Sequence, residues 1–122
     1  MYLKKHSLTL LTTTATTSTF TTTGEFEQPL YAVRYIRGSA PIGSATKIKI
    51  KTAGSSWQLL DVAASTASWY RGPRTSVIVS TSGEVHEALV QYPCYGQKLT
   101  VVLSATTASG KNGTVELWEG SA

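Results

Sequence analysis

The chain has 122 residues, the length of one domain, and only 15% of them are charged, where about a quarter is typical. Its single cysteine, Cys94, excludes an intrachain disulfide framework and a cysteine-based zinc cluster. The net charge of +4 permits attraction to an acidic partner, but such a charge also keeps a small domain soluble. Serine and threonine replace the missing charged residues, and β-branched threonine favours sheet over solvated helix.

The N-terminal segment is predicted to be a separate structural unit. Residues 1–11 start like a signal peptide, but their apolar run is too short, so neither a signal peptide nor a membrane span is predicted. Residues 4–11 are predicted to form a strand. Residues 12–23 are mostly threonine, and Phe20 is their one large apolar residue, so this tract has strand propensity but little surface to bury. We expect an extended arm or edge strand at 1–23 and a β-sandwich domain at 24–122.

The clearest strand signal lies in residues 28–51. In its first run Leu30, Ala32, Arg34 and Ile36 alternate with Tyr31, Val33, Tyr35 and Arg37. In the second run, Ile48 and Ile50 alternate with lysines. Period-two alternation indicates strands, and the glycines and proline in residues 38–44 indicate a turn. The two runs are therefore predicted to be neighbouring antiparallel strands.

Further strands are predicted in the rest of the chain. Residues 57–62 and 97–104 show strand patterns, residues 76–80 read as a strand buried on both faces, and residues 85–92 fit either helix or strand. Asn112 and Gly113 favour the positive φ angles of a hairpin turn into a last strand at 114–119. The predicted fold class is all-β, an antiparallel β-sandwich or jelly roll with an extended Thr-rich N-terminal arm or edge strand.

Groups suited to catalysis are few, so the chain is predicted not to be an enzyme, with no catalytic, cofactor-binding or metal site. Glu25 and Glu27 share a face of an extended segment and could pair as in glycoside hydrolysis, or they lie in a solvated turn. His86 lies between Glu84 and Glu87, but a metal site takes three or four ligands of matched type. The cysteine has no base near it in sequence and is predicted to be a buried small hydrophobe.

Aromatic and arginine residues gather in two segments, as they do in protein interfaces. The candidate interface residues are Phe20, Tyr31, Arg34, Tyr35, Arg37, Trp69, Tyr70, Arg71 and Arg74. Stacking of single-stranded nucleic acid or sugar on these groups is the alternative. A protein interface is favoured over either ligand, nucleic acid or sugar, because strand alternation commits half of the residues to the opposite face of the strand. A basic stripe of Lys47, Lys49 and Lys51 either follows a phosphate backbone or an acidic partner, or protects a sheet edge from aggregation.

The chain resembles small all-β virion proteins of tailed bacteriophages, such as head decoration or cement proteins. The likeness rests on the threonine-rich start, the turn at 24–26 leading to a strand, the Ile48-Lys-Ile50 and Trp57 strands, and the closing strands at 99–103 and 113–118. It implies a non-enzymatic homo-oligomer, often a trimer, that fastens the major capsid protein or other virion proteins. It also implies a virion location after assembly in the host cytoplasm.

Two alternative functions remain open at this point. One is a carbohydrate- or receptor-binding β-sandwich that uses Trp57, Trp69, Tyr70 and Trp118 as stacking platforms. The other is a head-tail or tail component. No cofactor is predicted under any of these readings.

Overall fold

The computed structural model describes residues 2–43, 45–54, 58–64, 67–73, 75–81, 84–90, 92, 94, 96–106 and 109–121. These residues form strands and connections and no helix, so the described part of the chain holds no helix that could cross a membrane. The strands are β1 (Tyr2–Leu11), β2 (Thr17–Thr21), β3 (Leu30–Arg37), β4 (Lys47–Thr52), β5 (Gln58–Ala63), β6 (Trp69–Arg71), β7 (Thr75–Thr81), β8 (Glu84–Val90), β9 (Leu99–Ser104) and β10 (Asn112–Ser121).

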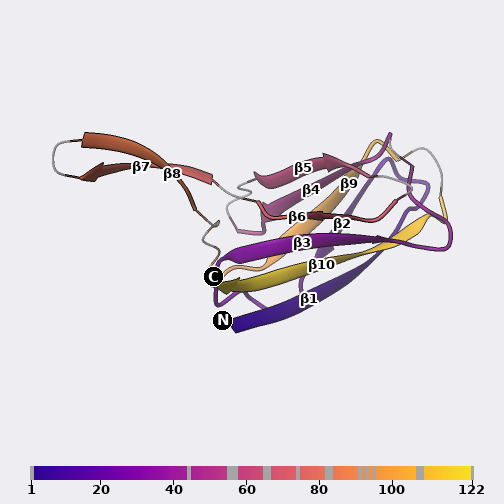
Figure 1. Cartoon of the computed structure of the whole chain (residues 1–122). Coiled ribbons are helices and arrows are strands. Elements are labelled where there is room, and N and C mark those ends of the chain that lie inside the picture. The colour runs from indigo at the N-terminus through magenta and orange to yellow at the C-terminus, as the bar shows by residue number, and fades with distance from the viewer. Residues whose placement is uncertain are drawn as a thin grey trace.

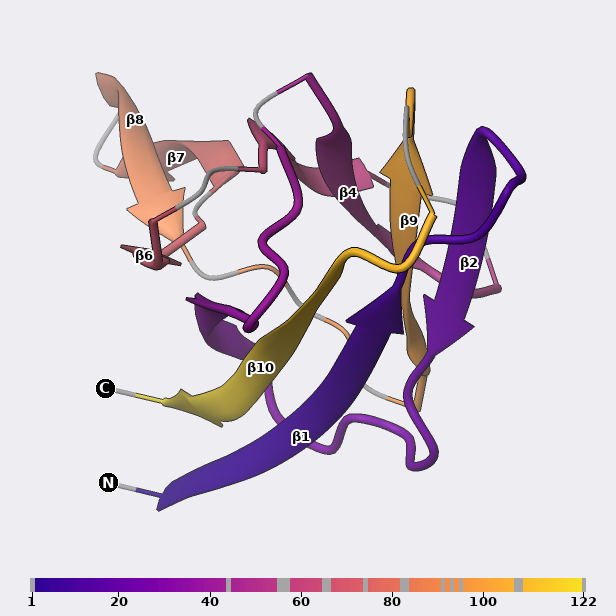
Figure 2. The same ribbon diagram turned by 90° about the vertical axis from the view of Figure 1, so that its right-hand side faces the viewer.

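Eight of these strands form two antiparallel four-stranded sheets that pack face to face (Figure 1). Sheet A has the order β1-β10-β3-β6, and sheet B has the order β2-β9-β4-β5. The chain passes between the two sheets after β1, β2, β3, β5 and β9, whereas β4 and β5 follow one another in sheet B (Figure 2). The predicted all-β class and β-sandwich are confirmed.

The core fills the space between the two sheets. Strand β9 alternates buried and half-buried residues along its whole length, and β4 does so from Ile48 onward. This is the pattern expected when one face of each strand packs inward. The buried cluster consists of Leu10, Phe26, Leu30, Val33, Tyr35, Ile42, Ile48, Ile50, Leu59, Ala64, Cys94, Leu99, Val101, Leu103, Val115 and Leu117.

The predicted pairing of the two central runs is wrong, because β3 belongs to sheet A and β4 to sheet B. The connection between them is long enough to change layers, and it is held where it crosses. Ile42 is buried in the core, and the backbone N–H of Asn112 donates to the Ala40 carbonyl at 2.8 Å. The apolar faces of β3 and β4 therefore contribute to one core from opposite sides.

The predicted hairpin at residues 109–113 is also wrong, because β9 and β10 lie in different sheets. The left-handed residue at this corner is Gly110, with φ of 75°, while Gly113 lies inside β10. The reason for glycine at 113 is packing: a Cβ there would lie 2.7 Å from Cε1 of Tyr35. The glycine lets the tyrosine ring approach the backbone of the strand closely.

The N-terminal segment supplies an edge strand to each sheet. Of the two predicted forms of this segment, an extended arm or an edge strand, the structure shows edge strands. Strand β1 pairs with β10 over its whole length, and β2 pairs with β9 from Thr17 to Thr21. The threonine hydroxyls near the strand ends bond to backbone groups. Oγ1 of Thr12 accepts from the Lys111 N–H at 2.9 Å, and Oγ1 of Thr22 accepts from the Leu99 N–H at 3.1 Å. These bonds tie the segment to the sandwich.

Strands β7 and β8 form a separate two-stranded ribbon that projects from one end of the sandwich (Figure 1). Residues 76–80 are a strand, as predicted, but this strand belongs to neither main sheet. The ambiguous segment 85–92 is a strand as far as Val90. Pairing with β7 favours the strand over the helix, because the two strands pair along their whole length, from Thr75 with Val90 to Thr81 with Glu84.

Candidate protein-binding groove

A groove crosses the outer face of sheet A, the face turned away from the core. Its volume is about 390 Å³, and all four strands of the sheet contribute to it. The lining residues are Leu3 on β1, Trp118 on β10, Tyr31, Ala32 and Arg34 on β3, and Tyr70 on β6. We call this the outer groove. Two of its side chains are unusually open for large apolar residues, Leu3 at 42% and Tyr70 at 58% exposed.

A β-bulge brings the aromatic wall of the groove into place. Trp118 pairs with Ala32, but the next residue, Glu119, pairs with Leu30, so Tyr31 is an extra residue in β3. A bulge of this kind breaks the strict alternation of side chains. Leu30 is buried in the core, whereas Tyr31 and Ala32 both line the outer groove. The short side chain of Ala32 leaves room between the larger neighbours.

A cluster of three charges lies at one end of the groove. Glu116, on β10 opposite Arg34, is only 10% exposed, and its Oε2 is 3.2 Å from Nζ of Lys5. Its Oε1 is 3.6 Å from a guanidinium nitrogen of Arg34. The same lysine lies over the Trp118 ring, 5.7 Å from its centroid. One carboxylate faces two cations here, so the rim of an apolar groove carries a net positive charge.

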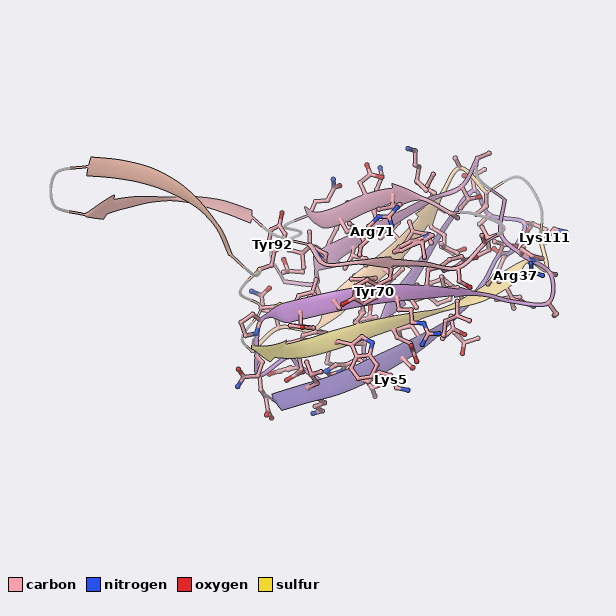
Figure 3. The ribbon with its side chains drawn as sticks, in the orientation of Figure 1. Lys5, Arg37, Tyr70, Arg71, Tyr92 and Lys111 are labelled. Atoms are coloured by element: carbon pink, nitrogen blue, oxygen red, sulfur yellow. The ribbon has the colours of Figure 1, made fainter. Side chains whose placement is uncertain are left out.

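The structure brings three of the predicted interface residues together. Tyr31, Arg34 and Tyr70 line the groove, and Tyr70 pairs with Arg34 across the strands. Figure 3 shows Tyr70 and Lys5 on the same broad face of the sandwich. That this surface binds a protein stays a prediction. The three side chains do lie together in one groove.

The other predicted interface residues lie elsewhere. Tyr35 is fully buried and packs against Trp69 with ring centroids 5.5 Å apart, and the Arg71 guanidinium lies 5.4 Å from the Trp69 centroid. Arg37 lies at the far end of the molecule beside Lys111 (Figure 3), and its backbone N–H donates to Oγ of Ser68. Two of the predicted residues remain to be placed: Phe20 packs half-buried against the core, and Arg74 lies outside the described residues.

Sequence reasoning did not assign Leu3, Ala32 or Trp118 to an interface. Trp118 was considered only as a stacking platform, and its partners come from strands more than 80 residues away in the sequence. Period-two alternation could place Glu116 and Trp118 on one face of the last strand. It could not show that β1 and β3 flank that strand. Trp57, another of the predicted stacking residues, lies outside the described residues.

A buried histidine–carboxylate pair lies on the core side of the same sheet. Nε2 of His6 is 2.5 Å from Oε2 of Glu119, which is completely buried, and the backbone N–H of Glu27 donates to Oε1 of Glu119 at 3.1 Å. The His6 ring stacks on Phe26 at 4.2 Å with an interplanar angle of 13°. The pair is enclosed, and both carboxylate oxygens of Glu119 have a partner, which indicates a structural role rather than a binding site.

The remaining candidates for chemistry lie apart from one another. Cys94 is fully buried, and burial raises the pKa of its thiol to about 11, with a smaller increase from the charge of Glu119. Glu25 and Glu27 are exposed in the connection before β3. The side chains of 84, 86 and 87 on β8 lie outside the described part of the structure.

The lysine stripe lies on an interior strand. β4 pairs with β9 on one side and with β5 on the other, so these lysines do not protect a free edge. They occupy the outer face of sheet B, where Lys49 is opposite Asp61 in the register. The proposed edge-protection role is wrong, because only the sheet order shows which strands are edges.

Comparison with known proteins gives one distant structural likeness. No protein-family model and no curated protein matches the chain. A solved structure, "Crystal Structure of FLHE", aligns over 98% of this chain and 97% of its own, with a TM-score of 0.44 and 10% identity. No comparison supports the predicted function as a phage capsid decoration or cement protein, and this prediction is withdrawn. At this TM-score the likeness assigns no function to the present chain.

Proposed function

We propose that this β-sandwich is a non-enzymatic binding protein whose outer groove holds an extended polypeptide segment with apolar and acidic side chains. The observation that carries the proposal is the groove itself, in which the exposed Tyr70 and the half-buried Tyr31 and Trp118 surround the small Ala32. Aromatic side chains at such positions supply a large contact area at low cost in conformational entropy. A space of about 390 Å³ is large enough for the apolar side chains of a short segment.

Polarity favours a polypeptide over a sugar. A glycan site needs several hydrogen-bonding groups around its aromatic platform. Arg34 is the one charged side chain among the six lining residues, and it already faces Glu116. The positive rim at Lys5 and Arg34 favours carboxylates on the occupant, because complementary charge directs association.

The chemistry of the described residues supports binding without catalysis. The carboxylates of Glu116 and Glu119 are both engaged with cationic partners or histidine. With its pKa raised to about 11, Cys94 stays a neutral thiol at neutral pH, and the thiolate is the form that attacks a substrate. Enzymatic nucleophiles have the opposite environment, one that lowers this pKa.

A selection of displayed random peptides on the immobilised full chain tests the proposal. We expect selected peptides to be rich in apolar and acidic residues. Tyr70→Ala should weaken their binding by about tenfold or more, since exposed aromatic anchors of this kind dominate small interfaces. Leu3→Ser should also weaken binding, because it removes apolar contact area from the groove wall. Ala32→Phe should block binding as well, because the larger side chain fills the floor of the groove.

Leu11→Ser is the matched control. Leu11 lies on the same strand as Leu3, is 50% exposed and faces the same side, but it does not line the groove. Its replacement should leave peptide binding unchanged. Selected peptides that bind all groove variants equally well would refute the proposal, and so would binding of oligosaccharides in place of peptides.

A further inference from the structure

The β7–β8 ribbon (residues 75–81 and 84–90) lacks a packing partner within the described part of its own chain. The two strands contact each other and no other strand. Figure 1 shows the ribbon extending away from the sandwich. An isolated two-stranded hairpin is only marginally stable in water, because it has no second layer to bury its apolar residues. The ribbon is therefore a segment that gains stability from a partner.

The sequence of the ribbon indicates what that partner offers. Among residues 75–90 the apolar ones are Val77, Ile78, Val79, Val85, Ala88, Leu89 and Val90. This segment also holds Glu84 and Glu87, two of the seven acidic residues, and none of the eleven lysines and arginines. It thus carries a formal charge of −2, while the rest of the chain carries +6. The ribbon is thus apolar and acidic, and the sandwich that carries it is basic.

We infer that the ribbon of one copy binds in the outer groove of a second copy of this chain. The inference rests on the proposed function, that the groove binds an apolar and acidic polypeptide segment, and it identifies that segment. Leu3, Tyr31, Tyr70 and Trp118 supply the apolar surface, and the rim at Arg34 supplies the positive charge. The ribbon meets both requirements and is held away from its own sandwich.

This contact makes the predicted homo-oligomer part of the proposal. Ribbon and groove are different surfaces, so copies join reciprocally in a dimer, or head to tail in a closed ring or an open filament. The predicted trimer is one such ring. The mass of the assembly measured by sedimentation equilibrium distinguishes these arrangements.

Two full-length double variants test the contact. The ribbon variant Glu84→Lys/Glu87→Lys keeps the groove, and the groove variant Leu3→Ser/Tyr70→Ser keeps the ribbon. Each alone should raise the dissociation constant of the assembly by about tenfold or more. Rising salt should weaken the wild-type assembly, because exposed charges are screened. Leu11→Ser should assemble as the wild type does, and circular dichroism checks that each variant is folded.

Mixing the two double variants gives the decisive measurement. One supplies an intact groove and the other an intact ribbon, so we expect a complex in the mixture that neither forms alone. A fluorescent label on the ribbon variant reports it by sedimentation velocity. Complex formation supports a ribbon-to-groove contact specifically, because two unrelated surfaces would not complement each other.

The inference and the proposed function fail in different ways. A wild-type chain that stays monomeric at millimolar concentration, or an assembly insensitive to the ribbon variant, overturns the inference while peptide binding in the groove can still stand. An assembly that depends on the ribbon but not on the groove variant also overturns it. Loss of peptide selectivity for the groove overturns the proposed function first and the inference with it.

Discussion

At the scale of single residues, the buried pair of His6 and Glu119 is the most demanding feature of the sheet. A carboxylate with no solvent exposure needs partners for its charge, and Glu119 has the imidazole on one side and the Glu27 N–H on the other. It follows directly after the bulged position at Trp118, where the register between β3 and β10 changes. The pair therefore fixes β1 against β10 at the end of the sheet where the outer groove lies.

Replacing both members of this pair should cost less than the two single replacements added together. His6→Leu leaves a carboxylate buried without its main partner, and we expect the free energy of unfolding to fall by about 3 to 5 kcal/mol. In His6→Leu/Glu119→Leu no charge remains buried, so the loss should be smaller than the sum of the single losses by at least about 1 kcal/mol. Urea unfolding of the four chains measures this, and additive losses would contradict the coupling.

Cys94 gives the molecule a dependence on alkaline pH. Burial raises the pKa of its thiol from 9.0 to about 11, so between these values the unfolded chain loses a proton that the folded chain keeps. The folded state then binds more protons, and stability falls as pH rises. We expect a loss of about 1 kcal/mol by pH 10 relative to pH 8. Cys94→Ala should lack this part of the pH dependence in urea titrations, and an unchanged slope would contradict it.

At the scale of elements, the N-terminal strands show why composition alone does not divide the chain. Residues 12–23 have little to bury, which made an arm a reasonable expectation. The structure uses β2 and β1 as the outer strands of sheets B and A, and β1 contributes Leu10 to the core. A strand with weak burial of its own is stabilised here by pairing with a strongly buried neighbour.

Removal of residues 1–23 should accordingly unfold the sandwich. The deletion exposes one side of β10 and of β9 together with core residues such as Val115 and Leu117. We expect the cooperative thermal transition to disappear and the backbone amide signals to lose dispersion in NMR spectra. A truncated chain with a cooperative transition like that of the full chain would instead support residues 24–122 as an independent domain.

At the scale of the whole molecule, the sandwich and the β7–β8 ribbon differ both in charge and in shape. The sandwich is basic and carries a groove with an apolar floor, and the ribbon is acidic, rich in β-branched residues and separated from the body. Such a division favours contact between copies over contact within one copy. The basic stripe on β4 lies on the opposite sheet from the groove, so its lysines are not part of this contact.

The sequence by itself determined the strands and the all-β class, because side-chain alternation and turn residues act locally. The runs at 30–37, 47–52 and 99–104 are strands as their period-two patterns predict. Three of the predicted interface residues, Tyr31, Arg34 and Tyr70, line the outer groove, but Leu3 and Trp118 were not predicted for an interface.

The tertiary structure alone decided which strands are neighbours. A turn-rich segment shows where the chain reverses, but not whether it returns in the same sheet or in the opposite layer, and both reversals predicted as hairpins change layers. Sheet order in turn assembles the groove from strands far apart in sequence and places the bulge at Tyr31. These features depend on packing between distant segments, which no local pattern records.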